Sequence, residues 1–189
     1  IRKGVVPNLP KPRLYSDYIK WLEGVDRESG KRYWRDYLDG YDQTAMLPWS
    51  RQSYKKNDAA HKKEILELDQ ELLQSIRSVC RRLGVTENTF LEGAWGYLLS
   101  RYNNTNDVVF GSVVSGRPPE IDGIEDMVGL FINTIPVRVR YRQGDSVADY
   151  LKNIQSRAID ALGHHYLSLS DVQAQSDLGN HLIDHVLGF

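Results

Sequence analysis

Apolar residues recur along the chain at two different spacings, and each spacing predicts a type of element. Spacings of three and four residues predict helices over 15–24, 27–38, 70–83, 87–103 and 147–162, with a shorter helix near 170–175. Alternating or continuous apolar runs predict strands over 61–68, 107–115, 134–141 and 182–189. Because helices and strands alternate, we expect an α/β fold with helices packed on a mixed β-sheet.

Polar residues that favour helix starts support several of these boundaries. Asp69, Thr86 and Ser146 each precede an apolar segment of helical spacing and are expected to be N-caps. Ser16 or Asp17 is expected to cap the first helix in the same way. The third long helix should bury the residues that share its apolar stripe: Phe90, Leu91, Ala94, Trp95, Leu98, Leu99 and Tyr102.

Composition narrows the class of protein. The chain has 189 residues, of which 41% are hydrophobic and 26% charged, as in an ordinary soluble globular domain. A net charge of −1 gives no basic field for nucleic acid, and no apolar run approaches the roughly 20 residues that cross a bilayer. The single cysteine, Cys80, cannot form an internal disulfide and is expected in the core, which suits a cytoplasmic location. The first residue, Ile1, suggests a piece of a longer protein.

Four histidines are candidates for chemistry. His164 and His165 could hold a metal or act as a base, but a pair at a helix end is explained by the favourable interaction of imidazole with the helix C-terminus. His181 and His185 are four residues apart, yet in a strand they would share a face without converging on one ion. The sequence therefore predicts no metal site, and it contains no phosphate-binding loop, dinucleotide fingerprint or nucleophile elbow.

A different segment combines a turn with a polar side chain. Residues 115–119 (SGRPP) follow a predicted buried strand, and residues 127–136 (MVGLFINTIP) contain Asn133, which can donate and accept hydrogen bonds. A loop at a strand end is a common place for a site. The alternative is that Gly116 and Pro118 form only a turn and Asn133 caps only a strand, and the residues alone favour neither interpretation.

Three segments, two of them in this region, resemble motifs of a known family. Residues 128–138 (VGLFINTIPVR) closely resemble the fifth core motif of the condensation domains of nonribosomal peptide synthetases, and the preceding SGRP at 115–118 is typical of them. Residues 15–21 (YSDYIKW) are similar to the fourth motif, Y-x-D-F/Y-x-x-W. Residues 164–169 and 180–189 stand in the places of the sixth and seventh motifs but lack their usual Pro-Phe and Arg-Asn-Pro. The resemblance covers essentially the whole chain.

The resemblance implies a chloramphenicol-acetyltransferase-like fold, in which two similar α/β subdomains enclose a tunnel. Residues 15–189 would be the C-terminal subdomain, truncated at its C-terminal end, and residues 1–14 an extended lead-in from the preceding subdomain. The family's catalytic H-H-x-x-x-D-G motif is absent, so we expect no catalytic residue here and no activity from the isolated chain. The tunnel-facing or supporting residues implied by motif position are Asn133, Arg117, Gly129, Phe131 and Thr134.

The implied function is peptide-bond formation between aminoacyl or peptidyl thioesters carried on phosphopantetheine arms, an acyltransferase activity of antibiotic biosynthesis. No cofactor or metal would bind directly to this chain. The expected partners are the N-terminal condensation subdomain, the upstream and downstream peptidyl carrier domains and an adjacent adenylation domain, with no nucleic acid and no membrane. The alternatives are a docking or scaffold subdomain without chemistry, an epimerisation or cyclisation relative, and a free-standing acetyltransferase.

Overall fold

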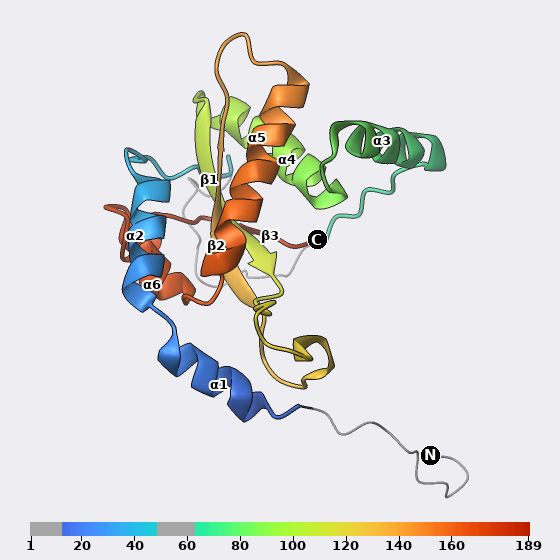
Figure 1. Cartoon of the computed structure of the whole chain (residues 1–189). Coiled ribbons are helices and arrows are strands. Elements are labelled where there is room, and N and C mark those ends of the chain that lie inside the picture. Colours follow the sequence, from blue (N-terminus) through green and yellow to red (C-terminus); the bar gives the residue numbers. More distant parts are fainter. Residues whose placement is uncertain (1–12, 49–62) are drawn as a thin grey trace, which may run out of the picture.

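The computed structural model describes residues 13–48 and 63–189, and Figure 1 shows helices arranged around a small sheet. Short 3₁₀ turns lie at Ile124–Asp126, Leu162–His164 and Gly179–His181. The helices and strands of the described residues follow in chain order: α1 Tyr15–Gly24, α2 Arg27–Leu38, α3 Gln70–Leu83, α4 Glu87–Asn103, β1 Asp107–Val114, β2 Asn133–Arg140, α5 Val147–Ala161, α6 Leu169–Gln173 and β3 Val186–Leu187.

The sheet is mixed, with the strand order β2-β1-β3. β1 and β2 are antiparallel over eight residue pairs, from Asp107 opposite Arg140 to Val114 opposite Asn133. β3 runs parallel to β1 and places Val186 opposite Gly111. The prediction of an α/β fold with helices on a mixed sheet is therefore confirmed.

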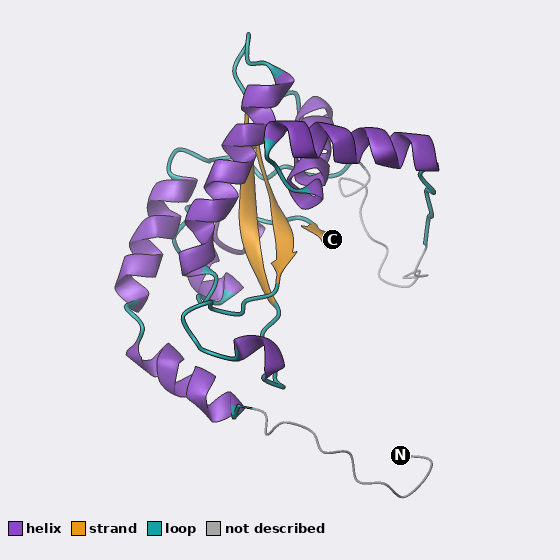
Figure 2. Cartoon of the chain, turned by 45° about the vertical axis from the view of Figure 1, so that its right-hand side comes forward, coloured by secondary structure: helices purple, strands orange, loops and turns teal. Residues whose placement is uncertain are grey.

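Alternate residues of β1 pack into two different helical layers, because successive side chains of a strand point to opposite faces. Val108 and Phe110 join a core with Leu99 of α4 and Ile154 of α5. Val109, between them, joins a second core with residues of α2, α6 and the segments around them. Figure 2 shows the strands between helices. One face of the sheet is therefore covered by α4 and α5, and the other by α2 and α6.

The helix α4 buries a stripe shifted from the one its apolar residues predict, and Leu99 belongs to both. Leu98 and Tyr102 are 43% and 58% exposed, whereas Gly93 and Gly96 are buried. A Cβ atom at Gly96 would lie 2.8 Å from the side chain of Val139 in β2. The glycines let the helix approach the sheet closely, and this packing outweighs the apolar pattern.

Of the four predicted strands, one is wrong over all its described residues and another is right for only two residues. Residues 61 and 62 lie outside the described residues, and 63–68 form exposed coil in which Leu66 is 87% exposed. From the predicted strand 182–189, only Val186–Leu187 pairs with β1. An apolar alternation makes a strand only where a neighbouring strand completes its hydrogen bonds, and these segments have little or no such neighbour among the described residues.

Helix boundaries agree well with the sequence. The prediction that α1 is capped by Ser16 or Asp17 is wrong, since α1 begins at Tyr15 and both residues lie inside it. Cys80 is 3% exposed, as expected of a core residue. Within the described part of the chain, no helix has the length and apolar character needed to span a bilayer. The other three predicted N-caps are confirmed. The side chains of Asp69, Thr86 and Ser146 each accept a hydrogen bond from the backbone N–H of the residue three positions later.

Candidate functional site

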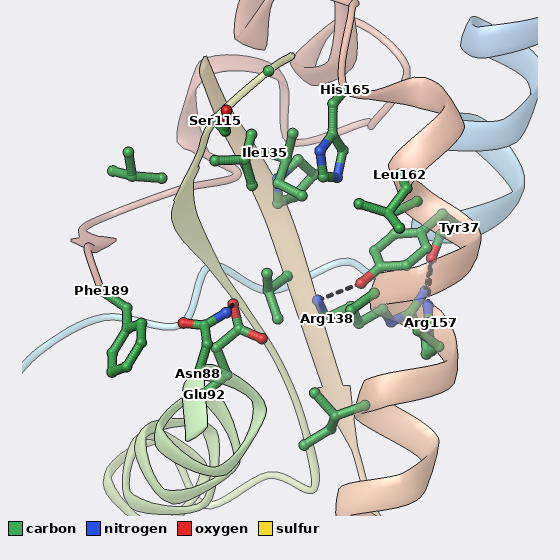
Figure 3. A pocket seen from close by; sticks show the side chains of 18 of the residues that line it. Tyr37, Asn88, Glu92, Ser115, Ile135, Arg138, Arg157, Leu162, His165 and Phe189 are labelled. Carbon is green, nitrogen blue, oxygen red and sulfur yellow. Dashed lines mark hydrogen bonds between the residues drawn. The ribbon is translucent and has the colours of Figure 1, made fainter. Parts of the chain in front are cut away.

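A cavity of about 390 Å³ lies between α4, α5 and the sheet, within the size range of small-molecule sites. Figure 3 shows Asn88 and Glu92 of α4 on one side, with Tyr37 of α2 and Arg157 of α5 on the other. Much of the remaining lining is apolar. Its other residues come from the end of β1 and the turn after it, from β2, from α5 and from two later segments: 113–117, 135–138, 154, 158, 161–162, 165 and 189.

Glu92 is a carboxyl side chain in the wall formed by α4. The residue is only 3% exposed. Its Oε1 accepts hydrogen bonds from the Ser112 hydroxyl at 2.8 Å and the Asn88 amide at 3.2 Å. Burial raises the pKa of Glu92, and these two hydrogen bonds lower it only in part. In residues 13–48 and 63–189, no Lys, Arg or His forms an ion pair with it, so no neighbouring cation offsets the effect of burial on its pKa.

The opposite wall carries a guanidinium and a phenol. The Cζ of Arg157 lies 4.2 Å from the ring centroid of Tyr37, and its Nη2 donates to the Tyr37 carbonyl at 3.3 Å. The Tyr37 hydroxyl accepts a hydrogen bond from the Arg138 backbone N–H at 2.8 Å. Burial raises the pKa of Tyr37, so its hydroxyl stays protonated at neutral pH.

Arg138 ties this wall to the far end of the sheet. Its side chain is 3% exposed and forms an ion pair with Asp107 at 2.8 Å. Its Nη1 also donates to the carbonyls of Tyr37 and Asp39, at 3.0 and 2.7 Å. Burial raises the pKa of Asp107, but hydrogen bonds and charges from Arg138 and Arg140 outweigh it and leave the pKa lowered. The charge of Arg138 is therefore neutralised within the fold.

His165 contributes an imidazole to the cavity. Its Nε2 is buried and has no hydrogen-bond partner within the described ranges. Burial, and then the charge of neighbouring His164, lowers the pKa of His165 to about 4. The imidazole is therefore neutral at physiological pH, so it can accept a hydrogen bond from a polar group that enters the cavity.

The other candidate histidines pack against aromatic rings. His164 lies in the 3₁₀ turn after α5 and stacks on Tyr33, with ring centroids 4.0 Å apart. His185 accepts a hydrogen bond from the Trp95 indole at 2.8 Å. His181 lies in the turn Gly179–His181, so the prediction that it shares a strand face with His185 is wrong. No cluster of His, Cys, Asp and Glu that could hold a metal ion occurs in the described part of the chain.

Three of the predicted site residues belong to a cluster beside α1. The Cζ of Arg117 lies 4.1 Å from the ring centroid of Phe131, and its Nη1 donates to the carbonyls of Ile124 and Met127. A Cβ atom at Gly129 would lie 2.0 Å from the ring of Tyr15, so only glycine fits there. The segment 15–21 is thus packed directly on the segment 128–138, far away in the sequence.

Asn133 uses its whole amide group inside the chain. Its Nδ2 donates to the carbonyls of His165 and Leu167 at 2.8 and 2.7 Å. Its Oδ1 accepts from the backbone N–H of Thr134 at 2.8 Å. Asn133 therefore fixes the segment 165–167 against the start of β2. Of the five residues predicted for the site, only Arg117 lines the cavity directly.

The sequence analysis missed the polar residues of the cavity, above all Glu92. It assigned the buried face of α4 from the large apolar residues, and that stripe does not include Glu92. One signal was present, because Glu92 stands next to Gly93 and one helical turn before Gly96. Small residues at this spacing indicate close packing, so an acidic residue on the same face is buried with them.

Sequence comparisons identify the family. A family model described as the condensation domain matches residues 2–189. Bacitracin synthase 3 of Bacillus licheniformis is 47% identical over 188 residues, which is 100% of this chain and 3% of that protein. Surfactin synthase subunit 2 of Bacillus subtilis (strain 168) is 40% identical over 189 residues, again 100% of this chain and 5% of that protein. The chain thus spans a small part of these relatives.

Solved structures agree on the fold. The first condensation domain of the CDA synthetase superimposes with a TM-score of 0.76 at 18% identity, over 99% of this chain and 41% of its own. The structure of holo T3CT superimposes with a TM-score of 0.65 at 26% identity, over 89% of this chain and 36% of its own. The fold and the whole-length match together lead to one conclusion: this chain belongs to the condensation-domain family.

Proposed function

We propose that this chain is the C-terminal half of a nonribosomal peptide synthetase condensation domain, with residues 15–189 as that subdomain. The observation that carries the proposal is the match over essentially the whole chain to a condensation domain of which the chain covers 41%. The catalytic H-H-x-x-x-D-G motif does not occur in the sequence. The half described here therefore supplies a wall of the reaction site, and the other half supplies the catalytic histidine.

The reaction joins two substrates held as thioesters on phosphopantetheine arms. The amine nitrogen of the acceptor forms a bond with the donor carbonyl carbon. The bond from that carbon to sulfur breaks, and the thiol of the donor arm leaves with the proton lost by the amine. Two peptidyl carrier domains and an adenylation domain are the partners that load and deliver these substrates. The gain from holding amine and carbonyl together is the general advantage of an oriented intramolecular reaction.

An exposed apolar stripe supports a second subdomain as the direct partner. Val128, Leu130 and Ile132 are 82%, 75% and 70% exposed. They alternate with Gly129 and Phe131, which pack inward against α1. Three large apolar side chains in a row on one face of an extended segment are unusual on a free surface and typical of an interface. This stripe is the surface on which the N-terminal subdomain would pack.

Asn133 acts in this proposal as a positioning residue. Its amide holds the carbonyls of His165 and Leu167, and His165 forms part of the cavity wall. An Asn133→Ala substitution in the intact domain should slow condensation, because it leaves two carbonyls without donors and loosens that wall. An unchanged turnover at limiting substrate would remove Asn133 from the functional account.

The experiment that tests the proposal reunites this chain with its own N-terminal subdomain and supplies two loaded carrier domains. We expect the joined domain to form the dipeptidyl thioester, and this chain alone to form none. Replacing the second histidine of H-H-x-x-x-D-G by alanine is the matched control and should abolish product. If the joined domain binds both carriers without forming product, the docking or scaffold alternative is favoured. Inversion of the donor without a new amide would favour epimerisation.

A further inference from the structure

The carboxyl group of Glu92 meets the cavity with only one of its two oxygens engaged. Both hydrogen bonds, from Ser112 and Asn88, go to Oε1. Oε2 accepts none from the residues that the structure describes, although the side chain is only 3% exposed. The carboxyl is thus already withdrawn from water, and its free oxygen can accept a hydrogen bond from an entering cation.

The lining beside Glu92 is suited to a hydrocarbon stem. Ile135 and Val137 of β2 and Ile154 of α5 line the same cavity, and Phe189 lies near the α4 wall. Long basic side chains pack their methylene groups on apolar surface and keep the charge at a polar tip. An aliphatic wall that leads to a single carboxyl matches that shape and that charge.

The arginines of the cavity do not neutralise Glu92. Arg138 is paired with Asp107 and with two carbonyls. Arg157 lies over the ring of Tyr37 and donates to its carbonyl. The guanidinium of Arg117 lies over Phe131 and donates to two carbonyls. Each of these cations has its own acceptors in the fold, so the carboxyl is left for a cation from outside.

We propose that the cavity receives the side chain of a carrier-tethered amino acid that ends in a primary amine, and that Glu92 is the residue that selects it. The inference rests on the proposed function, since the tethered amino acid is the substrate of that reaction. The ammonium hydrogen-bonds to Oε2, the carboxyl releases its proton to solvent, and the methylenes pack on the aliphatic wall. The α-amine of a substrate is a weaker fit, because it stands beside the carbonyl without a stem of its own.

Three soluble probes of similar length test the charge selectivity by calorimetric titration of the 189-residue chain. They are the N-methylamides of Nα-acetyl-lysine, Nα-acetyl-norleucine and Nα-acetyl-2-aminoadipate, which are cationic, neutral and anionic. We expect the lysine probe to bind about tenfold more tightly than the norleucine probe. Equal binding, tighter binding of the aminoadipate probe, or no binding of any probe would overturn the proposal.

Proton release gives a second and independent readout. Burial raises the pKa of Glu92, and a bound ammonium would lower it again, so the lysine probe should release protons near that pKa and the norleucine probe should not. Titrations in two buffers of different ionisation enthalpy measure this release. The cavity is also lined by other titratable or charged groups: Tyr37, Arg117, Arg138, Arg157 and His165. Binding of the lysine probe without proton release would contradict the role of Glu92.

A Glu92→Gln substitution completes the test. The glutamine keeps a carbonyl oxygen for Ser112 and Asn88, so the fold should persist, and we expect the preference for the lysine probe to disappear. Glu71→Gln on the exposed side of α3 is the control and should keep the preference. If Glu92→Gln does not fold, the ranking of probes on the unchanged chain still decides. These measurements need no peptide-bond formation, so a failed condensation assay counts against the proposed function and not against this binding site.

Discussion

The imidazole of His165 should make the stability of this fold fall in weak acid. Burial and the charge of His164 lower its pKa to about 4, from an ordinary value of 6.5 in the unfolded chain. Between these two values the unfolded state binds a proton that the native state does not. The contribution of His165 to stability is therefore complete above about pH 6.5 and is lost as the pH falls towards 4.

The magnitude follows from the difference between the two pKa values. A difference of about 2.5 pKa units corresponds to about 3.4 kcal/mol once the pH is below both values, and to about 2.6 kcal/mol at pH 4.5. His165 has no hydrogen-bond partner for Nε2 among the described residues, so no polar contact in that part of the chain is lost when the ring is replaced. A His165→Gln substitution should remove this pH dependence without removing its backbone hydrogen bond with Asn133.

Urea unfolding at about pH 7.5 and about pH 4.5 measures the effect in the unchanged chain, in His165→Gln and in His181→Gln. His181 is exposed and serves as the matched control. When the pH is lowered from the first value to the second, we expect the unfolding free energy of His165→Gln to fall by about 2–3 kcal/mol less than that of the unchanged chain. The His181→Gln chain should behave much like the unchanged chain. If the unchanged chain and His165→Gln lose the same free energy of unfolding in acid, the argument from the buried imidazole is refuted.

Three further substitutions test other parts of the site. Gly129→Ala forces a Cβ into the ring of Tyr15 and should cost about 1–3 kcal/mol of unfolding free energy in urea, whereas Gly24→Ala, with nothing within 4 Å, should cost much less; equal effects would contradict the close packing. Asn133→Asp keeps an acceptor for the neighbouring N–H but loses both donated bonds, so we expect a loss of about 2 kcal/mol in the same assay, and a neutral result would argue against the clamp. Burial raises the pKa of Glu92, so native stability falls as the pH rises through that pKa; Glu92→Gln should therefore gain stability at about pH 7.5 relative to about pH 4, and a pH-independent difference would rule out a buried, titrating carboxyl.

Local features of the sequence determined most of the helices. N-cap residues and apolar spacing act within one or two helical turns, so Asp69, Thr86 and Ser146 were sufficient to place the starts of α3, α4 and α5. The long strands β1 and β2 were also readable, because a buried strand next to an amphipathic one produces two distinct patterns. The motifs also indicated the family, and the family model that matches residues 2–189 confirmed it.

Tertiary structure decided which residues share a site. Motif position pointed to Asn133, but its amide is engaged by His165 and Leu167, residues more than 30 positions away. The two adjacent histidines separate in the same way, since His164 stacks on Tyr33 while His165 lines the cavity. No local pattern carries such information, because it depends on which segment arrives on the other side.

The buried face of α4 gives the physical reason for this division. Large apolar residues predict one stripe, but the close approach of α5 and β2 to Gly93 and Gly96 rotates another stripe inward and buries Glu92 with it. The cost of burying that carboxyl is set by the partners that other elements bring, here Ser112 of β1. The sequence by itself determined the long helices, the two long strands and the family of this protein, because these depend on neighbouring residues and continuous motifs. Only the folded chain decided the cavity and its carboxyl, because these depend on contacts between distant segments.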